Sequence, residues 1–449
     1  MSLGQQLRLS AILSGPAILA QLSSVMMQYI DASMVGHLGA AAGASIGLVS
    51  TCTWLMGGFA MACCCGFSVQ VAHYIGADDF KGARSVMRQG LFSSLLFGCF
   101  LSLVSIALSG PLPGWIGGSP EINPDASAYF LITGAFMPFM QTGWMAAMML
   151  QGSGNMRVPS ILNVLMCVMD VGFNYLFIYG LDMGVKGAAL GTGMSELITC
   201  FLMLYFLLFR SRELGIRGEK GSFIPTRKVL REALSISLPM FFQNIVMRGA
   251  HVATTVIVAP LGTVAIAANA FAVTAESFCY MPGYGIADAA TSLVGQSLGA
   301  GRKDLAKRFA AITSAGAMAI MTFLGILMYI GAPWLMGMLT PDPEVISLGV
   351  KVLRIEAFAE TLYAASIAAD GAFMGAGDTL VPSIMNFGSM WLVRVIPAIF
   401  LTRIYGLQGF WIAMCIELNF RGIIFLIRLS GNRWMSRQIT SKPKGTAAA

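Results

Sequence analysis

The chain has 449 residues, of which 56% are hydrophobic and 11% are charged, and its mean hydropathy is +0.74. Soluble domains contain about 25% charged residues, so this composition excludes a soluble enzyme and a disordered protein. The net charge of +7 gathers in short loops rather than on one face, which excludes a nucleic-acid binder. We therefore predict an all-α integral membrane protein whose partners include the lipid bilayer and no nucleic acid.

Twelve apolar segments are each long enough to cross roughly 30 Å of hydrocarbon at about 1.5 Å per residue. The first six predicted spans cover 10–36, 42–74, 86–110, 124–150, 157–181 and 184–209. The other six cover 230–258, 264–298, 304–334, 345–375, 379–402 and 405–429. Several exceed the length that a bilayer requires, so we expect tilted or bent helices.

The distribution of basic residues predicts the orientation of these spans. If the N-terminus is inside, 21 of the 28 Lys and Arg residues fall on the cytoplasmic side. The opposite loops hold little beyond Lys186 and Arg403, together with acids such as Glu121. We therefore predict that both termini face the cytoplasm.

The chain contains an internal repeat with a shift of 223 residues. Pro16 matches Pro239 (239 − 16 = 223), and Gly76 matches Gly299 (299 − 76 = 223). The run VPSI at 158–161 recurs at 381–384. Each copy holds six spans, an even number, so both copies insert the same way up and are related by a pseudo-twofold axis along the membrane normal.

The repeat and a basic, polar stretch in the middle predict the division of the chain. We expect an N-terminal six-helix lobe (1–209), a cytoplasmic linker (210–229), a C-terminal six-helix lobe (230–430) and a cytoplasmic tail (431–449). Two lobes with a cleft between them are typical of transporters that work by alternating access.

Ionisable residues inside the spans are candidates for function, because a charge at bilayer depth is costly. The acids are Asp31, Asp170, Glu196, Glu276, Asp288, Glu356, Glu360, Asp370 and Glu417, and the bases are Arg248, Arg354, Arg394 and Arg421. We interpret two sets as structural charge pairs: Glu356 and Glu360 with Arg354, and Glu417 with Arg394 or Arg421.

The N-terminal lobe concentrates oxygen atoms at one depth. Asp31, Asp170, Asn174 and Thr192 all fall roughly 8–16 Å below the outer surface, by their distance along the spans. Asp170 and Asn174 are four residues apart and share a helix face. Hard cations prefer oxygen ligands, and a buried carboxyl group beside another also binds a proton readily. The alternative is that both aspartates only hold helices together by hydrogen bonds.

Prolines and methionines suggest where a helix bends and where cargo binds. Pro16 lies fifteen residues before Asp31 on the same predicted helix, and we expect it to act as a hinge. Flexible thioethers and polar groups suit varied apolar cations, although core packing is the alternative for any one methionine. The candidate cleft residues are Met137, Gln141, Met145, Met148, Glu276, Glu360 and Asp370.

Several stretches resemble the multidrug and toxic compound extrusion (MATE) family, and its DinF-like branch in particular. The first is YIDASMVGHLG, which contains Asp31, and another is GVKGAALGT, which ends at Thr192. The run from Leu261 to Arg308 is similar to the span-8 region of the family throughout. The stretches GAFMGAGDTLVPS and WLVRVIP match its spans 10 and 11.

The resemblance implies a multidrug efflux transporter in a bacterial or archaeal cell membrane. Such proteins export organic cations in exchange for protons or sodium by alternating access, and we expect a monomer without a cofactor. The cation site of the family maps onto Asp31, Asp170, Asn174 and Thr192, and its bending proline onto Pro16. The family usually has asparagine before aspartate in span 5, whereas this chain has Asp170 before Asn174. Because that exchange disturbs the fixed oxygens that sodium needs, we favour the proton.

Two other functions stay open. A related exporter of lipid-linked precursors or polysaccharides would favour several cationic residues in the cleft, whereas nine buried acids outnumber four bases here. A receptor or scaffold would need an extramembrane domain, and the sequence predicts none.

The nine cysteines lie in apolar runs without histidines at ligand spacing, so we expect no metal site other than one for sodium. No nucleophile–histidine–acid set appears, so we do not expect an enzyme.

Overall fold

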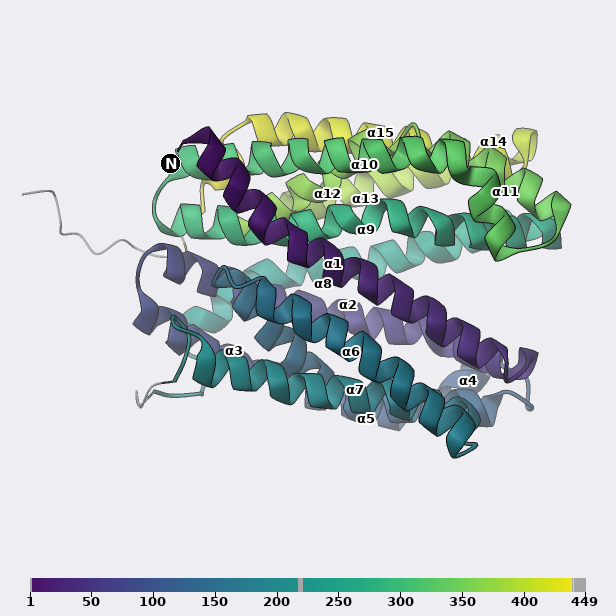
Figure 1. Ribbon diagram of the computed structural model, residues 1–449, viewed down its shortest axis with the longest axis horizontal. Helices are drawn as coiled ribbons and strands as arrows, with labels where there is room; N and C mark the ends of the chain where they lie inside the picture. The colour runs from purple at the N-terminus through teal and green to yellow at the C-terminus, as the bar shows by residue number, and fades with distance from the viewer. Residues whose placement is uncertain (1, 217–220, 438, 440–449) are drawn as a thin grey trace, which may run out of the picture. The chain divides into compact units, whose positions relative to one another are not determined.

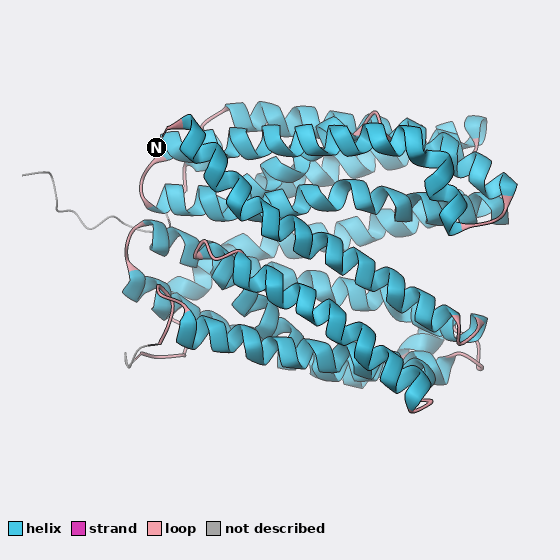
Figure 2. Ribbon diagram, viewed as in Figure 1, coloured by secondary structure: helices cyan, strands magenta, loops and turns pink. Residues whose placement is uncertain are grey.

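The computed structural model describes residues 2–216, 221–437 and 439, which form helices joined by loops (Figures 1 and 2). The first half contains α1 (Leu3–Gly36), α2 (Ala40–Gly76), α3 (Phe80–Ser109), α4 (Leu112–Trp115), α5 (Asn123–Gly152), α6 (Arg157–Tyr175), η1 (Leu176–Gly180), α7 (Gly184–Tyr205) and η2 (Phe206–Arg210). The second half contains α8 (Arg227–Val258), η3 (Ala259–Leu261), α9 (Thr263–Gly299), α10 (Lys303–Leu339), α11 (Pro343–Glu356), α12 (Glu360–Gly375), α13 (Leu380–Gly388), η4 (Ser389–Val395), α14 (Ile396–Tyr405), α15 (Leu407–Ser430) and η5 (Arg433–Met435).

These helices correspond to the twelve predicted spans. Ten of the helices in the described residues are long and apolar enough to cross a membrane. The two remaining predicted spans, 124–150 and 345–375, correspond to α5 and to the pair α11 and α12. The predicted span 345–375 consists of two helices, because the first stops at Glu356 and the second starts at Glu360.

The repeat is visible in how the helices are joined. Gly39, between α1 and α2, has a φ of 111°, and Gly262, between η3 and α9, has a φ of 96°. The two glycines are 223 residues apart (262 − 39 = 223). Side chains with a Cβ atom rarely adopt a positive φ, so both copies need glycine at the turn between their first two spans. Between α2 and α3, the carboxylate of Asp79 caps α3 by accepting from the Gly82 amide at 2.8 Å.

The chain forms two compact units. Among the described residues, unit 1 comprises 2–22, Phe242–Val294 and Lys303–Arg437, and unit 2 comprises 23–216, 221–241, Gly295–Arg302 and 439. The division falls inside α1, α8 and α9, so each of these helices contributes to both units. The predicted lobe boundaries at 209 and 230 stay a prediction.

Each unit has its own apolar core. In unit 2, α5 packs against α2, α3 and α7, with Met145, Met149 and Leu150 fully buried. In unit 1, α12 packs against α10 and α15, and Trp411 of α15 is fully buried. Inside a bilayer, these large side chains stabilise each unit through van der Waals packing between the helices rather than through removal of apolar surface from water.

Two glycines related by the repeat bring the ends of α2 and α9 together within unit 2. A Cβ atom at Gly76 would overlap the backbone of Gln296, and one at Gly299 would overlap the backbone of His73. The Gln296 amide also donates to the carbonyl oxygen of Gly152 at 2.8 Å. Only glycine permits this close backbone approach, which accounts for its presence in both copies.

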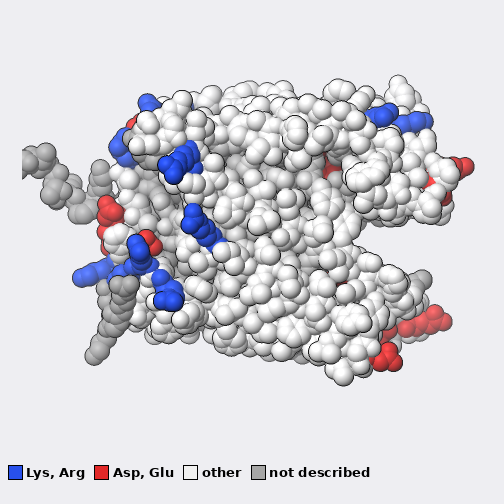
Figure 3. Space-filling model, in the orientation of Figure 1, with Lys and Arg blue, Asp and Glu red and all other residues white. Residues whose placement is uncertain are grey.

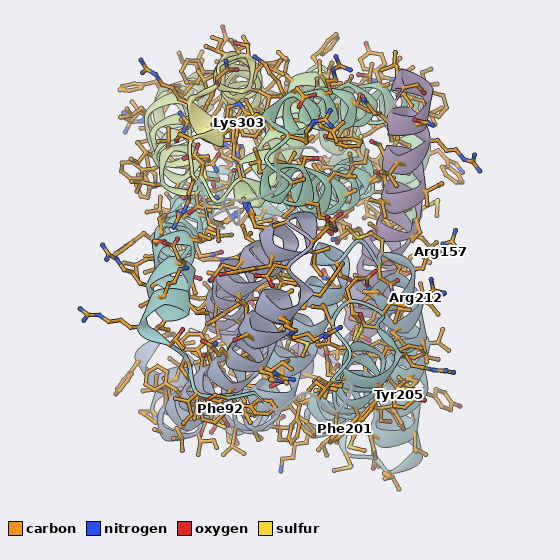
Figure 4. The ribbon with its side chains drawn as sticks, turned by 90° about the vertical axis from the view of Figure 1, so that its left-hand side faces the viewer. Phe92, Arg157, Phe201, Tyr205, Arg212 and Lys303 are labelled. Carbon is orange, nitrogen blue, oxygen red and sulfur yellow. The ribbon has the colours of Figure 1, made fainter. Side chains whose placement is uncertain are left out.

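Most of the exposed charged residues on one face of the molecule lie near the helix ends (Figure 3). On the face drawn in Figure 3, the middle of the helices is covered by uncharged side chains, and charged ones gather toward the helix ends. Figure 4 looks onto one end of the helices and shows Arg157, which begins α6, and Arg212, which follows η2, at that end of unit 2. Both residues belong to the set that we predict to be cytoplasmic.

Candidate functional site

The site is built on the buried face of α6. Asp170 and Asn174 are one helical turn apart and are 0% and 1% exposed. The polar pair lies on the side of α6 that packs against α7, while Val168 and Tyr175 point outward. The 3.6-residue period of α6 therefore places a carboxyl group and an amide together inside unit 2.

The amide of Asn174 joins the two aspartates. Its nitrogen Nδ2 donates to Asp31 Oδ1 at 2.8 Å and to Asp170 Oδ2 at 3.0 Å. Asp31 comes from the C-terminal part of α1 and is partly buried, and its carboxyl group lies within hydrogen-bond reach of that of Asp170. Two carboxyl groups at this separation readily share a proton, because two bare charges would repel each other.

Helix α7 completes the network with a hydroxyl group. Ser195 Oγ lies 3.3 Å from Asp170 Oδ1 and 2.8 Å from the carbonyl oxygen of Thr192. The predicted site residue Thr192 thus reaches the network through its main chain, and Ser195 is the residue that contacts the aspartate. Sequence reasoning missed Ser195, although it lies three residues after Thr192 on the same helix face.

A glycine allows α7 to approach the site. A Cβ atom at Gly191 would lie 2.9 Å from the backbone nitrogen of Asn174 and would overlap its side-chain oxygen. The chain therefore needs glycine at this position for Ser195 to reach Asp170.

Tyr129 of α5 is a second residue that sequence reasoning missed, and it lies within electrostatic range of Asp31 and Asp170. A partly buried tyrosine gave no distinct signal among the many aromatic residues of the spans.

One oxygen of the network has no partner. Asn174 Oδ1 is buried and accepts no hydrogen bond among the described residues. An unpaired buried acceptor costs free energy, by about 1–3 kcal/mol. The site therefore offers two carboxyl groups and a free amide oxygen, which suit a proton or a small cation.

The predicted hinge lies elsewhere on α1. Pro16 is inside the continuous helix α1, in the part that belongs to unit 1, whereas Asp31 belongs to unit 2. Just after the proline, the backbone at Ala17 and Ile18 contacts Gly285 of α9, where a Cβ atom would lie 2.6 Å from the Ile18 nitrogen. Pro16 thus lies beside a close helix contact rather than beside the site.

Most predicted cleft residues of α5 are in the packed interior of unit 2. Met137 is 3% exposed, and Gln141 and Met145 are fully buried, while Met148 is partly exposed. The Gln141 amide donates to the carbonyl oxygen of Ala60 at 3.3 Å, so it joins α5 to α2. These contacts explain their burial, because α5 is surrounded by α2, α3 and α7.

Unit 1 contains an ion-paired group. Glu417 is fully buried and accepts from Arg394 Nη2 at 2.5 Å and from Arg421 Nε at 2.8 Å. Arg354, which we interpreted as a partner of Glu356, is exposed instead. It donates to the carbonyl oxygen of Tyr329 at 3.3 Å and stacks on the ring of that residue. That interpretation is wrong because Arg354 precedes the break in the helix and points outward.

The other predicted cleft acids also belong to unit 1. Glu276 of α9 is 6% exposed and Glu360 of α12 is 0% exposed, while Asp370 of α12 is partly buried. Glu276 and Glu360 lie within electrostatic range of each other. Asp370 lies within electrostatic range of Arg421, and it is ten residues after Glu360 along α12. The structure therefore brings the first two together and leaves the third apart.

A comparison with known families identifies both halves of the chain. The MatE family model matches residues 16–176 and again residues 239–400. The two matches begin 223 residues apart (239 − 16 = 223), which is the shift of the internal repeat. Together they cover more than half of the chain.

Relatives and solved structures agree with this match. The chain is 27% identical over 442 residues to the probable multidrug resistance protein NorM of Thermotoga maritima, with 96% of this chain and 93% of that one covered. It is 26% identical to the NorM protein of Idiomarina loihiensis, with 96% and 95% covered. An outward-facing multidrug resistance MATE transporter of the MOP superfamily has a TM-score of 0.90 at 22% identity, with 96% and 99% covered. A MOP superfamily transporter from Pyrococcus furiosus has a TM-score of 0.88 at 21% identity, with 95% and 97% covered.

The fold of these solved structures confirms the predicted architecture of twelve helices in two six-helix lobes. The family and its solved members are membrane transporters and not enzymes. With two matched halves and a common fold along nearly its whole length, the chain belongs to the MatE family of membrane transporters.

Proposed function

We propose that this chain exports organic cations from the cell in exchange for protons, as a multidrug efflux transporter that works by alternating access. The relatives named as multidrug resistance proteins support the type of cargo. The observation that carries the proposal is the Asn174 amide, which joins the carboxyl groups of Asp31 and Asp170 inside unit 2. We propose these residues and Thr192 as the coupling site.

The orientation of the Asn174 amide favours a proton over sodium. Its nitrogen, not its oxygen, faces both carboxyl groups, so an N–H donor occupies the place where a sodium ion would need oxygen. Two carboxyl groups with an amide bridge need only one proton to relieve their repulsion.

The same pair provides competition between cargo and ion. With Asp31 and Asp170 both ionised, unit 2 carries two buried negative charges that attract an organic cation. A proton on either residue weakens this attraction, because it removes one of the two charges. An antiporter requires that cargo and proton exclude each other from the site, since the two must not be bound at the same time. Pro16 is proposed as the point where α1 bends between the two states.

The arginines of unit 1 argue against a lipid-linked or polysaccharide exporter. An exporter of that kind would hold a pyrophosphate group with several basic side chains. Arg394 and Arg421 both donate to Glu417, with distances of 2.5–3.0 Å. Their donors are directed at this carboxylate rather than at a phosphate, so anionic cargo is the less suitable alternative.

We also propose the setting of this activity. The protein acts as a monomer in the cell membrane of a prokaryote, with residues 1–209 and 230–430 as its two lobes. Both termini face the cytoplasm, because Lys and Arg residues gather in the loops on that side.

Efflux from proteoliposomes tests the proposal. The purified chain is reconstituted with a fluorescent organic cation such as ethidium inside, and a proton gradient or a sodium gradient is then imposed separately. We expect efflux under the proton gradient in sodium-free buffer, and loss of efflux when a protonophore is added. Efflux that requires sodium and survives the protonophore would assign the site to sodium. Absence of efflux under both gradients, with orientation verified, would refute transport of this cargo.

A further inference from the structure

A third carboxyl group lies beside the proposed coupling site in unit 2. Glu196 of α7 is 7% exposed and lies one helical turn after Thr192. The residue before it, Ser195, contacts Asp170 at 3.3 Å, so α7 is held against α6 at this level. Glu196 and Asp170 lie within electrostatic range of each other. Glu196 is thus a buried acid next to the site, and the exchange of cargo for protons described above does not use it.

The groups around Glu196 are neutral or acidic. The indole of Trp144 on α5 lies within hydrogen-bond reach of its carboxyl group. Asp170 and Cys167 of α6 and Cys200 of α7 lie within electrostatic range. Of the other elements packed against α7, namely α2, η1 and η2, none contributes a titratable group to this interaction among the described residues. An indole N–H can only donate, so it holds the carboxyl group in place in either protonation state.

A structural ion pair does not account for Glu196. The repeat places Glu417 of α15 within two residues of the matching position (417 − 223 = 194), and that residue is paired with Arg394 and Arg421. Glu196 itself makes no ion pair within the described part of the chain. A glutamine would serve equally as a partner of Trp144 and would avoid the cost of a charge inside the membrane. The ability to ionise is therefore the property that distinguishes Glu196.

The three carboxyl groups lie at increasing depth from the helix ends that we predict to face outward. The hydroxyl of Tyr179 donates to the carbonyl oxygen of Met34 at 2.9 Å, so the ends of η1 and α1 meet there. Asp31 lies five residues before the end of α1 (36 − 31 = 5), and Asp170 lies ten residues before the end of η1 (180 − 170 = 10). Glu196 lies twelve residues after the start of α7 (196 − 184 = 12). At about 1.5 Å per residue, the depths are about 8, 15 and 18 Å.

Burial makes the middle carboxyl group depend on its neighbours for protons. Asp170 is 0% exposed, so water does not reach it directly. Asp31, which is partly buried, lies within hydrogen-bond reach of Asp170 and can pass it a proton. A proton that enters in this way crosses the membrane only if a further group accepts it at greater depth. Glu196 is an acid that interacts with Asp170 on that side.

We propose that Glu196 is the inner acid of a proton relay and receives the proton that Asp31 and Asp170 bind. The proposal rests on the proposed function, because it concerns the same exchange of cargo for protons. In the transfer, the O–H bond of protonated Asp170 breaks, the proton binds a carboxylate oxygen of Glu196, and the negative charge moves to Asp170. The regained charge on Asp170 then attracts the next cargo cation. Release of the proton from Glu196 toward the cytoplasmic side completes its passage.

Two transport modes of the reconstituted chain separate a relay residue from a residue that binds cargo. Proton-driven efflux of ethidium requires net proton transfer, whereas exchange of radiolabelled for unlabelled ethidium at equal pH requires none. The variants are Glu196→Gln, which keeps the size and cannot ionise, and Glu196→Asp, which keeps an acid. The matched control is Glu121→Gln, an exposed glutamate of the same unit.

We expect Glu196→Gln to lower proton-driven efflux by about tenfold or more, because the last proton acceptor is lost. Ethidium exchange by this variant should stay at the wild-type rate, because Asp31 and Asp170 are intact. Glu196→Asp should recover part of the proton-driven efflux. Glu121→Gln should match the wild type in both modes.

A second variant decides the result if Glu196→Gln does not fold, as judged by its elution and thermal unfolding. Trp144→Phe removes the N–H donor within reach of Glu196 and keeps an aromatic ring. It should shift the pH at which proton-driven efflux is half-maximal and leave ethidium exchange unchanged. The same pH dependence as in the wild type would contradict the relay.

Two outcomes of the main experiment would overturn the proposal. One is proton-driven efflux by Glu196→Gln at the wild-type rate, because the proton would then bypass this residue. The other is a folded Glu196→Gln variant that loses efflux and exchange together, because Glu196 would then hold cargo. Absence of proton-driven efflux in the wild type would refute the proposed function itself, and this result is distinct from a normal wild type with a normal Glu196→Gln variant.

Discussion

Asp31→Asn separates the coupling role of the site from its structural role. The asparagine that replaces Asp31 keeps an oxygen where Asn174 Nδ2 now donates at 2.8 Å. A hydrogen bond to a charged group contributes about 1.5–3 kcal/mol and one to a neutral group about 0.5–1.5 kcal/mol. The exchange therefore costs about 1 kcal/mol of folding stability and removes a charge from the membrane, so the variant should insert and fold.

Transport should respond much more strongly than stability. With Asp31 neutral at all pH values, the pair has lost one of its two ionisable carboxyl groups and can no longer exchange cargo for a proton. We expect proton-driven efflux of a fluorescent cation from proteoliposomes to fall by about tenfold or more, which corresponds to about 1.4 kcal/mol. Thermal unfolding of the same sample should change by only a few degrees. Glu121→Gln, an exposed acid before α5, is the control and should keep the wild-type rate.

The reasoning fails if Asp31→Asn exports the cation at the wild-type rate under the proton gradient. A variant that is inactive and also unfolds at a much lower temperature would instead show that Asp31 is a structural residue. Each result is read from the same preparation, so transport and stability are compared directly.

Three further predictions concern the proposed coupling site and the ion-paired group of unit 1. The double variant Asp170→Asn with Asn174→Asp keeps one carboxyl group on the same face of α6, so it should retain more efflux than Asp170→Asn alone; equal loss would show that the position of the charge is decisive. Gly191→Ala should reduce efflux because its Cβ atom forces α7 away from α6, whereas Gly172→Ala, whose Cβ atom would meet nothing within 4 Å, should not; equal rates in vesicles would contradict this. Glu417→Ala leaves two buried arginines without their partner and should lower the unfolding free energy by about 3–5 kcal/mol, which thermal unfolding of the detergent-solubilised protein measures.

The sequence by itself determined the class and the symmetry of this protein. Hydropathy depends on composition along the chain, so twelve apolar segments were sufficient to predict the helices that cross the membrane. The shift of 223 residues needed only a comparison of the chain with itself, and the two family matches begin at the same interval. The spacing of Asp170 and Asn174 predicted a shared face, because helical periodicity is a local property.

Only the tertiary structure decided which polar side chains of different helices contact each other. The contact of Ser195 with Asp170 depends on how closely α7 approaches α6, and spacing along one helix cannot show that distance. The Asn174 amide donates to carboxyl oxygens from two helices, Asp31 of α1 and Asp170 of α6. The sequence therefore could not show that the amide nitrogen, rather than its oxygen, faces the carboxyl groups. The break between Glu356 and Glu360 contains no helix-breaking residue, so only the structure shows that the helix stops between these two buried glutamates.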